Sequence, residues 1–336
     1  MAMVAMSFNE KLEKQFENFT IETPNVSNYI EHVYADFVEL HALFLKEEVT
    51  IADISDKLQD VKDFNILETE QLDSEEEKLE EIASLEAERN DIIAERFYSI
   101  FEICKDRQSL YANDEYPFVV LDNQIRLKEN LSDKQKMYIL LLLCSNLNYF
   151  NTIKHELTVD FELLSYYTLT SYLPSKAIVK SFGKNSGYKG NAVSKIKTLA
   201  KEIGININEN KISCISPQNV QERGCDLIAW IPFTDKIPNM LIVLSQCACG
   251  KNWDTKQSDT EFFKGYFYFE KSPLHIMFIP CAISNMGEKF FQHDRILDHI
   301  FFDRKRILEQ FEEINFFARL KSFPAIEKSI SDRILV

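Results

Sequence analysis

The 336-residue chain lacks long apolar runs, and this argues against a membrane-spanning helix. Its longest run, Met137 to Cys144, has eight residues, whereas a span needs ~18. Glycine and proline are also scarce, with 8 and 9 residues, and aromatic residues make up 12%, which excludes collagen-like and disordered classes. With 45% hydrophobic and 27% charged residues, the composition is typical of a globular protein. The length is sufficient for two domains of ~150 residues each.

Features of secreted proteins are also missing. The seven cysteines are an odd number spread over a long chain, so we expect no disulfide framework. The apolar N-terminus, Met1 to Met6, has no Lys or Arg before its apolar stretch and is a poor signal peptide. We therefore expect a cytoplasmic protein that does not contact a membrane.

The charge of the chain is unevenly distributed. Residues 1–170 carry a net charge of −20 and residues 171–336 carry +5, which together give the −15 of the whole chain. Such asymmetry indicates different partners for the two halves. Only the second half has the charge to bind a polyanion such as DNA. A net charge of +5 is, however, also ordinary for a domain of this size.

The first half is predicted to be an acidic, mainly helical domain over residues 1–170. Apolar residues at helical spacing predict helix within 7–50, and Tyr116 to Leu121 reads as a short strand. Ser132 and Gln135 form a capping box at the start of a buried helix.

Residues 68–100 contain twelve acidic residues but only Lys78, Arg89 and Arg96 as basic ones. A helix with one solvent-exposed face would explain the acidic composition of this segment. A helix that docks a protein partner, or an acidic segment that covers the basic half of the chain, would explain it too.

The second half, residues 171–336, is predicted to be an α/β domain with a mixed central sheet flanked by helices. A helix is expected over 191–203, and further helices over 290–301 and 304–320. The expected strands are short, β-type apolar runs at 205–207, 211–215, 225–232, 240–247 and 275–280.

The residues that point to chemistry lie on two of these strands. Asp226 begins an apolar run, Leu-Ile-Ala-Trp, and Gln246 ends the next one. If the two runs form a hairpin, both side chains come to the same neighbourhood. An amide at the end of an apolar strand must find partners for its polar atoms, whereas an Asp alone is often just a turn or cap residue.

The pattern Gly-Cys-Asp-Leu-Ile-Ala at 224–229 followed by Gln-Cys at 246–247 resembles the PD-(D/E)xK, or restriction-endonuclease-like, nuclease core in its Mrr-like variant. The resemblance covers about residues 180–310. It implies a metal-dependent DNA endonuclease. A nuclease domain joined to a helical N-terminal region resembles the effectors of bacterial anti-phage defence systems, in which the helical region restrains or recruits the nuclease.

The chain departs from this family where a lysine should follow Gln246, because position 248 is Ala. The resemblance therefore requires a lysine from elsewhere, and Lys256 is preferred to Lys251 because Trp253, one helical turn earlier, would anchor it. The same departure favours an alternative in which an inactive nuclease fold binds DNA or a protein partner. A third hypothesis is a structural adaptor that works through residues 68–100.

Phosphodiester hydrolysis by such a site needs Mg²⁺ or Mn²⁺, which polarises the phosphate and lowers the pKa of a bound water. Oxygen ligands suit these ions. The expected ligands are Asp226, the Gln246 amide, the backbone carbonyl of Cys247 and, from the preceding helix, Glu202. The lysine would orient the water and stabilise developing charge.

A glycine-containing basic loop, 182–190, precedes the helix at 191–203. It lacks the P-loop pattern, and Lys184, Lys189 and Lys195 are interpreted as contacts to a DNA backbone, with a plain surface loop as the alternative.

Cys247 and Cys249 have no second pair at zinc-site spacing and are interpreted as packing residues. Arg304 and Arg306 are interpreted as structural rather than DNA-binding.

Overall fold

The computed structural model describes most of the chain after residue 96 and shorter parts before it. The described residues are 30–44, 48–54, 97–151, 153–183, 186–219, 224–235, 237–250, 253–284, 289–290, 293–311, 316–324, 326–327 and 330. The acidic segment 68–100, in which a docking helix was expected, lies almost wholly outside these residues.

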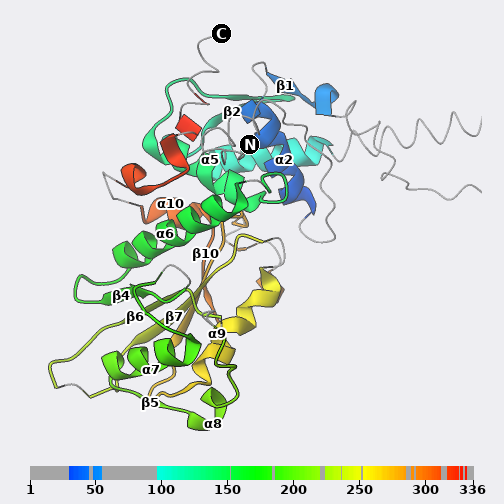
Figure 1. The fold of residues 1–336 in the computed structure, drawn as a ribbon. Helices are drawn as coiled ribbons and strands as arrows, with labels where there is room; N and C mark the ends of the chain where they lie inside the picture. Colours follow the sequence, from blue (N-terminus) through cyan, green and yellow to red (C-terminus); the bar gives the residue numbers. More distant parts are fainter. Residues whose placement is uncertain are drawn as a thin grey trace, which may run out of the picture. The chain divides into compact units, whose positions relative to one another are not determined.

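The chain forms two compact units (Figure 1). The smaller includes Phe16–Lys136, and the larger includes Met137–Ser284 and Lys289–Ile330. The units therefore divide well before residue 170, where the composition had placed the boundary. The reason is packing: α6 (Lys154–Tyr172) lies against β4 and β7 of the central sheet and belongs to the same unit.

The smaller unit combines helices with a small sheet. Helix α2 (Ile30–Phe44) follows the predicted apolar spacing, and residues 97–110 are also helical. The expected strand at 116–121 is confirmed as β2 (Phe118–Leu121). It forms a hairpin with β3 (Gln124–Leu127), which pairs in turn with β1 (Val49–Thr50). A mainly helical expectation missed this three-stranded sheet.

The capping box is confirmed. The Ser132 N–H donates to Gln135 Oε1 at 2.8 Å, and the Gln135 N–H donates to Ser132 Oγ at 3.1 Å. Helix α5 (Asp133–Ser145) follows directly. Among the described residues, no helix is long and apolar enough to cross a membrane.

The larger unit is built on a mixed five-stranded sheet with the strand order β10-β9-β7-β6-β4. Strand β6 pairs antiparallel with both β4 and β7, whereas β9 pairs parallel with both β7 and β10. The strands are β4 (Ile178–Ser181), β6 (Leu227–Trp230), β7 (Ile242–Cys247), β9 (Leu274–Phe278) and β10 (Ile300–Phe302). The mixed sheet of an α/β domain is thus as expected, and three of its strands fall on predicted runs.

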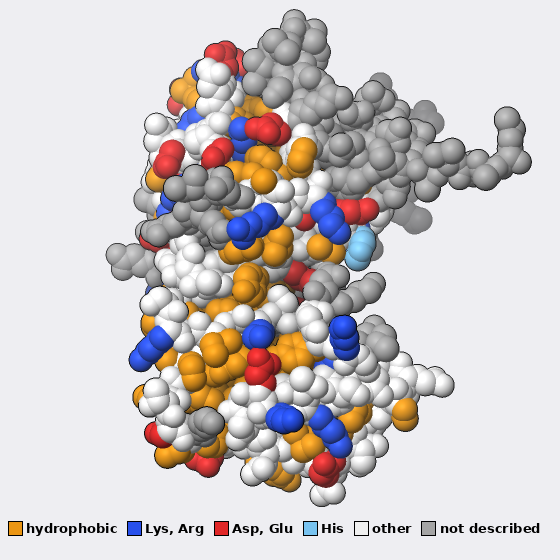
Figure 2. Space-filling model, turned by 60° about the vertical axis from the view of Figure 1, so that its left-hand side comes forward, with side chains coloured by type: hydrophobic (Ala, Val, Ile, Leu, Met, Phe, Trp, Pro, Cys, Tyr) orange, Lys and Arg blue, Asp and Glu red, His pale blue; other side chains and the backbone are white. Residues whose placement is uncertain are grey.

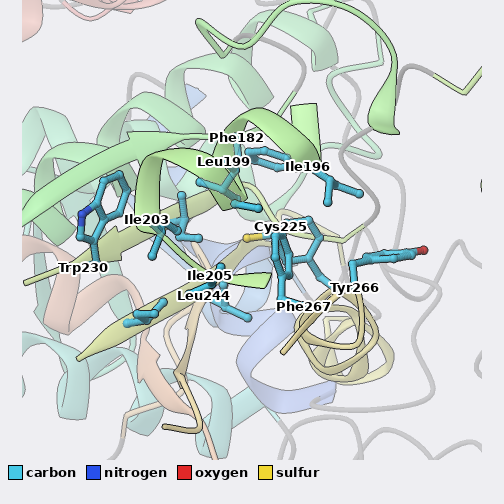
Figure 3. Close-up of a cluster of buried hydrophobic side chains, with 14 of the residues drawn as sticks. Phe182, Ile196, Leu199, Ile203, Ile205, Cys225, Trp230, Leu244, Tyr266 and Phe267 are labelled. Carbon is cyan, nitrogen blue, oxygen red and sulfur yellow. The ribbon is translucent and has the colours of Figure 1, made fainter. Parts of the chain in front are cut away.

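Helix α7 (Ala192–Ile203) covers one face of this sheet. The Asn191 side chain caps it by accepting the Ser194 N–H at 2.9 Å. Its apolar stripe, which includes Ile196, Leu199 and Ile203, packs with Trp230 and Leu244 (Figure 3). Helix α6 lies on the opposite face of the sheet. That face carries the β7 side chains that alternate with Leu244 along the strand.

Several expected elements were wrong. The run 211–215 is not a strand, because α8 (Glu209–Ile212) begins at the Asn208 cap. Residues 290–301 are not a helix, because Ile300–Phe302 pairs with β9 as β10. Of the helix expected over 304–320, the described residues form α10 (Arg304–Glu309) and a short 3-10 turn, η3 (Phe317–Arg319), with Gln310, Phe311 and Leu320 outside both.

Candidate functional site

The hairpin of β6 and β7 brings Asp226 and Gln246 to the same end of neighbouring strands. Leu227 is the register partner of Ser245, so Asp226 lies beside Gln246 where β6 begins and β7 ends. Both side chains are more than nine-tenths buried, with exposed fractions of 5% for Asp226 and 7% for Gln246. The hairpin placement inferred from the sequence is therefore present in the structure.

Asp226 is bound into the end of the sheet. Its carboxylate Oδ2 accepts the Cys247 N–H at 2.7 Å, which continues the ladder beyond the last strand pair. Its backbone carbonyl accepts the N–H groups of Phe182 at 2.7 Å and Gly183 at 3.2 Å. The side chain and backbone carbonyl of this one residue thus connect the ends of three strands, and the carboxylate is held by the Cys247 N–H.

Gln246 carries a buried acceptor that none of the described residues satisfies. Its Oε1 accepts no hydrogen bond from any residue in the described parts of the chain. Leaving a buried polar atom unpaired costs about 1–3 kcal/mol. Such an atom calls for an explanation, and a donor or a cation supplied from outside the chain provides one.

The cysteines after Gln246 are buried thiols. Burial raises the pKa of Cys247 well above its ordinary value, and the negative charge of Asp226 raises it further. Burial likewise raises the pKa of Cys249. Neither is poised to be a thiolate metal ligand, which agrees with their interpretation as packing residues. A metal role for Cys247 is confined to its backbone carbonyl.

Helix α9 (Gln257–Lys264) covers the sheet face that carries Gln246. The His275 Nδ1 of β9 lies 2.8 Å from Thr260 Oγ1 of α9, and the His299 Nε2 lies 3.3 Å from the same oxygen. His275 is the register partner of Leu244, two residues before Gln246 on the same face. Burial lowers the pKa of both histidines.

Lys256 lies at the end of the 3-10 turn η1 (Asp254–Lys256), directly before α9, and its side chain is exposed. The expected anchor is present: Trp253 is buried and packs edge-to-face on Phe301, with ring centroids 5.2 Å apart. Lys251 lies outside the described residues.

Glu202 has other partners than Asp226 and Gln246. Its Oε1 lies 3.0 Å from Lys180 Nζ, and its Oε2 accepts the Tyr188 hydroxyl at 2.5 Å. Burial alone would raise the pKa of Glu202, but these two partners lower it overall. Both oxygens are therefore engaged in holding the 186–190 segment to β4, a role that the sequence did not reveal.

The basic residues expected to contact DNA differ in placement. Lys189 is exposed, as expected, and Lys184 lies outside the described residues. Lys195 is only 6% exposed and falls on the buried stripe of α7, so its interpretation as a surface contact was wrong. On the face drawn in Figure 2, the Lys and Arg side chains of the described residues are scattered singly rather than gathered in one patch.

A divalent cation suits the donors that are present. In the described parts of the chain, no group of three or more His, Cys, Asp and Glu residues could hold a metal ion. The Asp226 carboxylate and the Gln246 amide oxygen are, however, hard oxygen donors. Mg²⁺ accepts one or two carboxylates and keeps several waters, so a small protein ligand set is compatible with it.

Comparisons with known proteins add no candidate. No protein-family model matches the chain, and no curated protein or solved structure matches it. The function is therefore inferred from the geometry of the site.

Proposed function

We propose that the larger unit is a metal-dependent DNA endonuclease with a restriction-endonuclease-like core. The observation that carries the proposal is the pair formed by Asp226 and Gln246. A buried carboxylate and a buried, unsatisfied amide oxygen stand side by side where two strands of a mixed sheet end.

In this proposal Asp226 and Gln246 hold Mg²⁺ or Mn²⁺, with Cys247 adding its backbone carbonyl. The cation polarises the scissile phosphate and makes a nearby water more acidic. Lys256 orients that water and stabilises the charge that develops on the phosphate. The hydrogen bond from the Cys247 N–H keeps the Asp226 carboxylate in place throughout.

A second candidate is a nuclease fold that binds DNA or a protein partner without cleaving it. Ala248 favours it, because the family pattern has a lysine there and this side chain is fully buried. A role as an effector in anti-phage defence stays a prediction, as does a protein partner for the acidic segment.

The test is cleavage of supercoiled plasmid by the full chain with Mg²⁺ or Mn²⁺. Asp226→Asn keeps an oxygen that can accept the Cys247 N–H but removes the charge, and it should slow cleavage by about 100-fold or more. The matched control is Asp235→Asn in the loop of the same hairpin, where the exposed carboxylate accepts the Ile237 N–H. This control should cleave within about twofold of wild type.

The outcomes separate the two candidates. Metal-dependent cleavage that Asp226→Asn abolishes supports the endonuclease. DNA retention without cleavage, equal for wild type and Asp226→Asn, supports the inactive module. Cleavage that Asp226→Asn leaves unchanged contradicts the proposed site.

A further inference from the structure

The first turn of α9 is pressed against the segment that leads into Asp226. Gly224 has φ +92°, and a Cβ built on it would lie 2.8 Å from the Asp259 carbonyl oxygen and 2.9 Å from Asp259 Cβ. No side chain fits between these two backbones. Asp259 is thus held against the chain two residues before Asp226.

Lys256 and Asp259 lie on one side of this helix end. They are three residues apart, a spacing that brings helical side chains together, and the Lys256 charge acts on the Asp259 carboxylate. The turn that contacts Gly224 therefore carries one cation and one anion. The Asp259 carboxylate makes no hydrogen bond or ion pair with any residue that the structure describes.

The unsatisfied oxygen of Gln246 belongs to the same region. Gln246 points to the face of the sheet that α9 covers, because Leu244 shares that face and its register partner His275 contacts Thr260. Thr260 is the residue next to Asp259. Gln246 is thus a 93% buried side chain on the sheet face that is covered in part by the helix that presents Asp259.

We infer that Asp259 is the second carboxylate of the site and binds a divalent cation together with Asp226 and Gln246. It takes the place that the sequence had given to Glu202, whose oxygens are occupied by Lys180 and Tyr188. This inference rests on the proposed function and adds to it a ligand from a different element. Two carboxylates with one amide and waters make a suitable ligand set for Mg²⁺ or Mn²⁺.

The test is Mn²⁺ binding to the full chain, measured by calorimetry and by the electron paramagnetic resonance signal of free Mn²⁺. Asp259→Asn keeps the size of the side chain and should raise the Mn²⁺ dissociation constant by about 10-fold or more. Glu202→Gln should leave it within about twofold. Asp254→Asn, an acid one turn earlier that faces Arg295 at 3.6 Å, is the matched control and should also leave it within about twofold.

Each variant is first checked for an unchanged thermal unfolding midpoint, and Asp259→Glu, which keeps the charge, should recover part of the affinity. Weaker binding for Asp226→Asn and Asp259→Asn alone supports the inference. Weaker binding for Asp226→Asn with wild-type affinity for Asp259→Asn overturns the inference and leaves the proposed function standing. If the wild-type chain does not bind Mn²⁺, the proposed metal site fails and this inference fails with it.

Discussion

The contact between Gly224 and Asp259 requires glycine at position 224, and the substitution Gly224→Ala tests this requirement. A non-glycine residue at a left-handed φ costs about 1–2 kcal/mol. The added methyl would also lie under 3.0 Å from the Asp259 backbone, and overpacking of this kind costs about 1–3 kcal/mol. The free energy of unfolding should therefore fall by about 2–5 kcal/mol.

The assay is urea unfolding followed by circular dichroism, with Gly187→Ala as the matched control. Gly187 has no atom within 4 Å of its hypothetical Cβ and no positive φ. Its substitution should be neutral or stabilising by up to about 1 kcal/mol.

Because α9 must move to admit the methyl group at 224, Gly224→Ala should also weaken Mn²⁺ binding, whereas Gly187→Ala should not. Equal stability for the two variants would refute the contact on which the placement of Asp259 depends.

Two further predictions concern stability in the larger unit. His275 and His299 have lowered pKa values, mainly through burial, so the folded state binds fewer protons than the unfolded state below the ordinary pKa of about 6.5. Stability should then be lost as pH falls below ~6.5, by up to about 1.4 kcal/mol per pH unit for a histidine that stays neutral. Urea midpoints at pH 7.5 and 5.5 should show a smaller difference in His275→Gln than in wild type, whereas the exposed His293→Gln should keep the wild-type difference.

Arg304, fully buried, donates to the Pro280 carbonyl at 3.0 Å and to Ser145 Oγ at 2.9 Å. Arg304→Met should lower the unfolding free energy by about 3 kcal/mol or more because these acceptors lose their donor. The exposed Arg306→Met should cost no more than about 1 kcal/mol, and similar losses for both would contradict this account.

The sheet and its hairpin could be predicted because local sequence determines them. Strand β6 is apolar along its whole length, β7 begins with the apolar residues Ile242 to Leu244, and both strands are buried on both faces. Such runs stand out in a sequence. Once the two runs are paired, Asp226 and Gln246 come together through register alone. Helix α7 was equally clear, since a cap residue, an apolar stripe and a terminal glycine agree.

Residues whose surroundings depend on how a helix is rotated about its axis were harder to place. Glu202 is one of many acids on helices, and only the tertiary fold shows that it faces Lys180 and Tyr188. The burial of Lys195 was available from the sequence, because this residue lies three positions after Ala192 and four before Leu199 on the buried stripe of α7. It was missed because its charge was given more weight than its position.

Asp259 could not have been found from its own surroundings in the sequence. Its placement depends on a glycine 35 positions earlier that adopts a positive φ and lets two backbones touch. Strand β10 was missed for a related reason: the run Ile-Phe-Phe suits a strand or a helix, and its parallel partner β9 decides between them. Such contacts between distant segments leave no periodic pattern.

The resemblance to the nuclease pattern would place a lysine at position 248, and the burial of Ala248 gives a physical reason why the proposed site would take its lysine from elsewhere. Ala248 is fully buried between two cysteines whose pKa values are raised by burial. An ammonium group there would lose its hydration, which is costly without a close partner. Lys256 instead offers its charge from an exposed position on the turn that also presents Asp259. In the proposed site, the lysine and the second carboxylate would then come from the same helix end, and the contact between Gly224 and Asp259 would position both relative to Asp226.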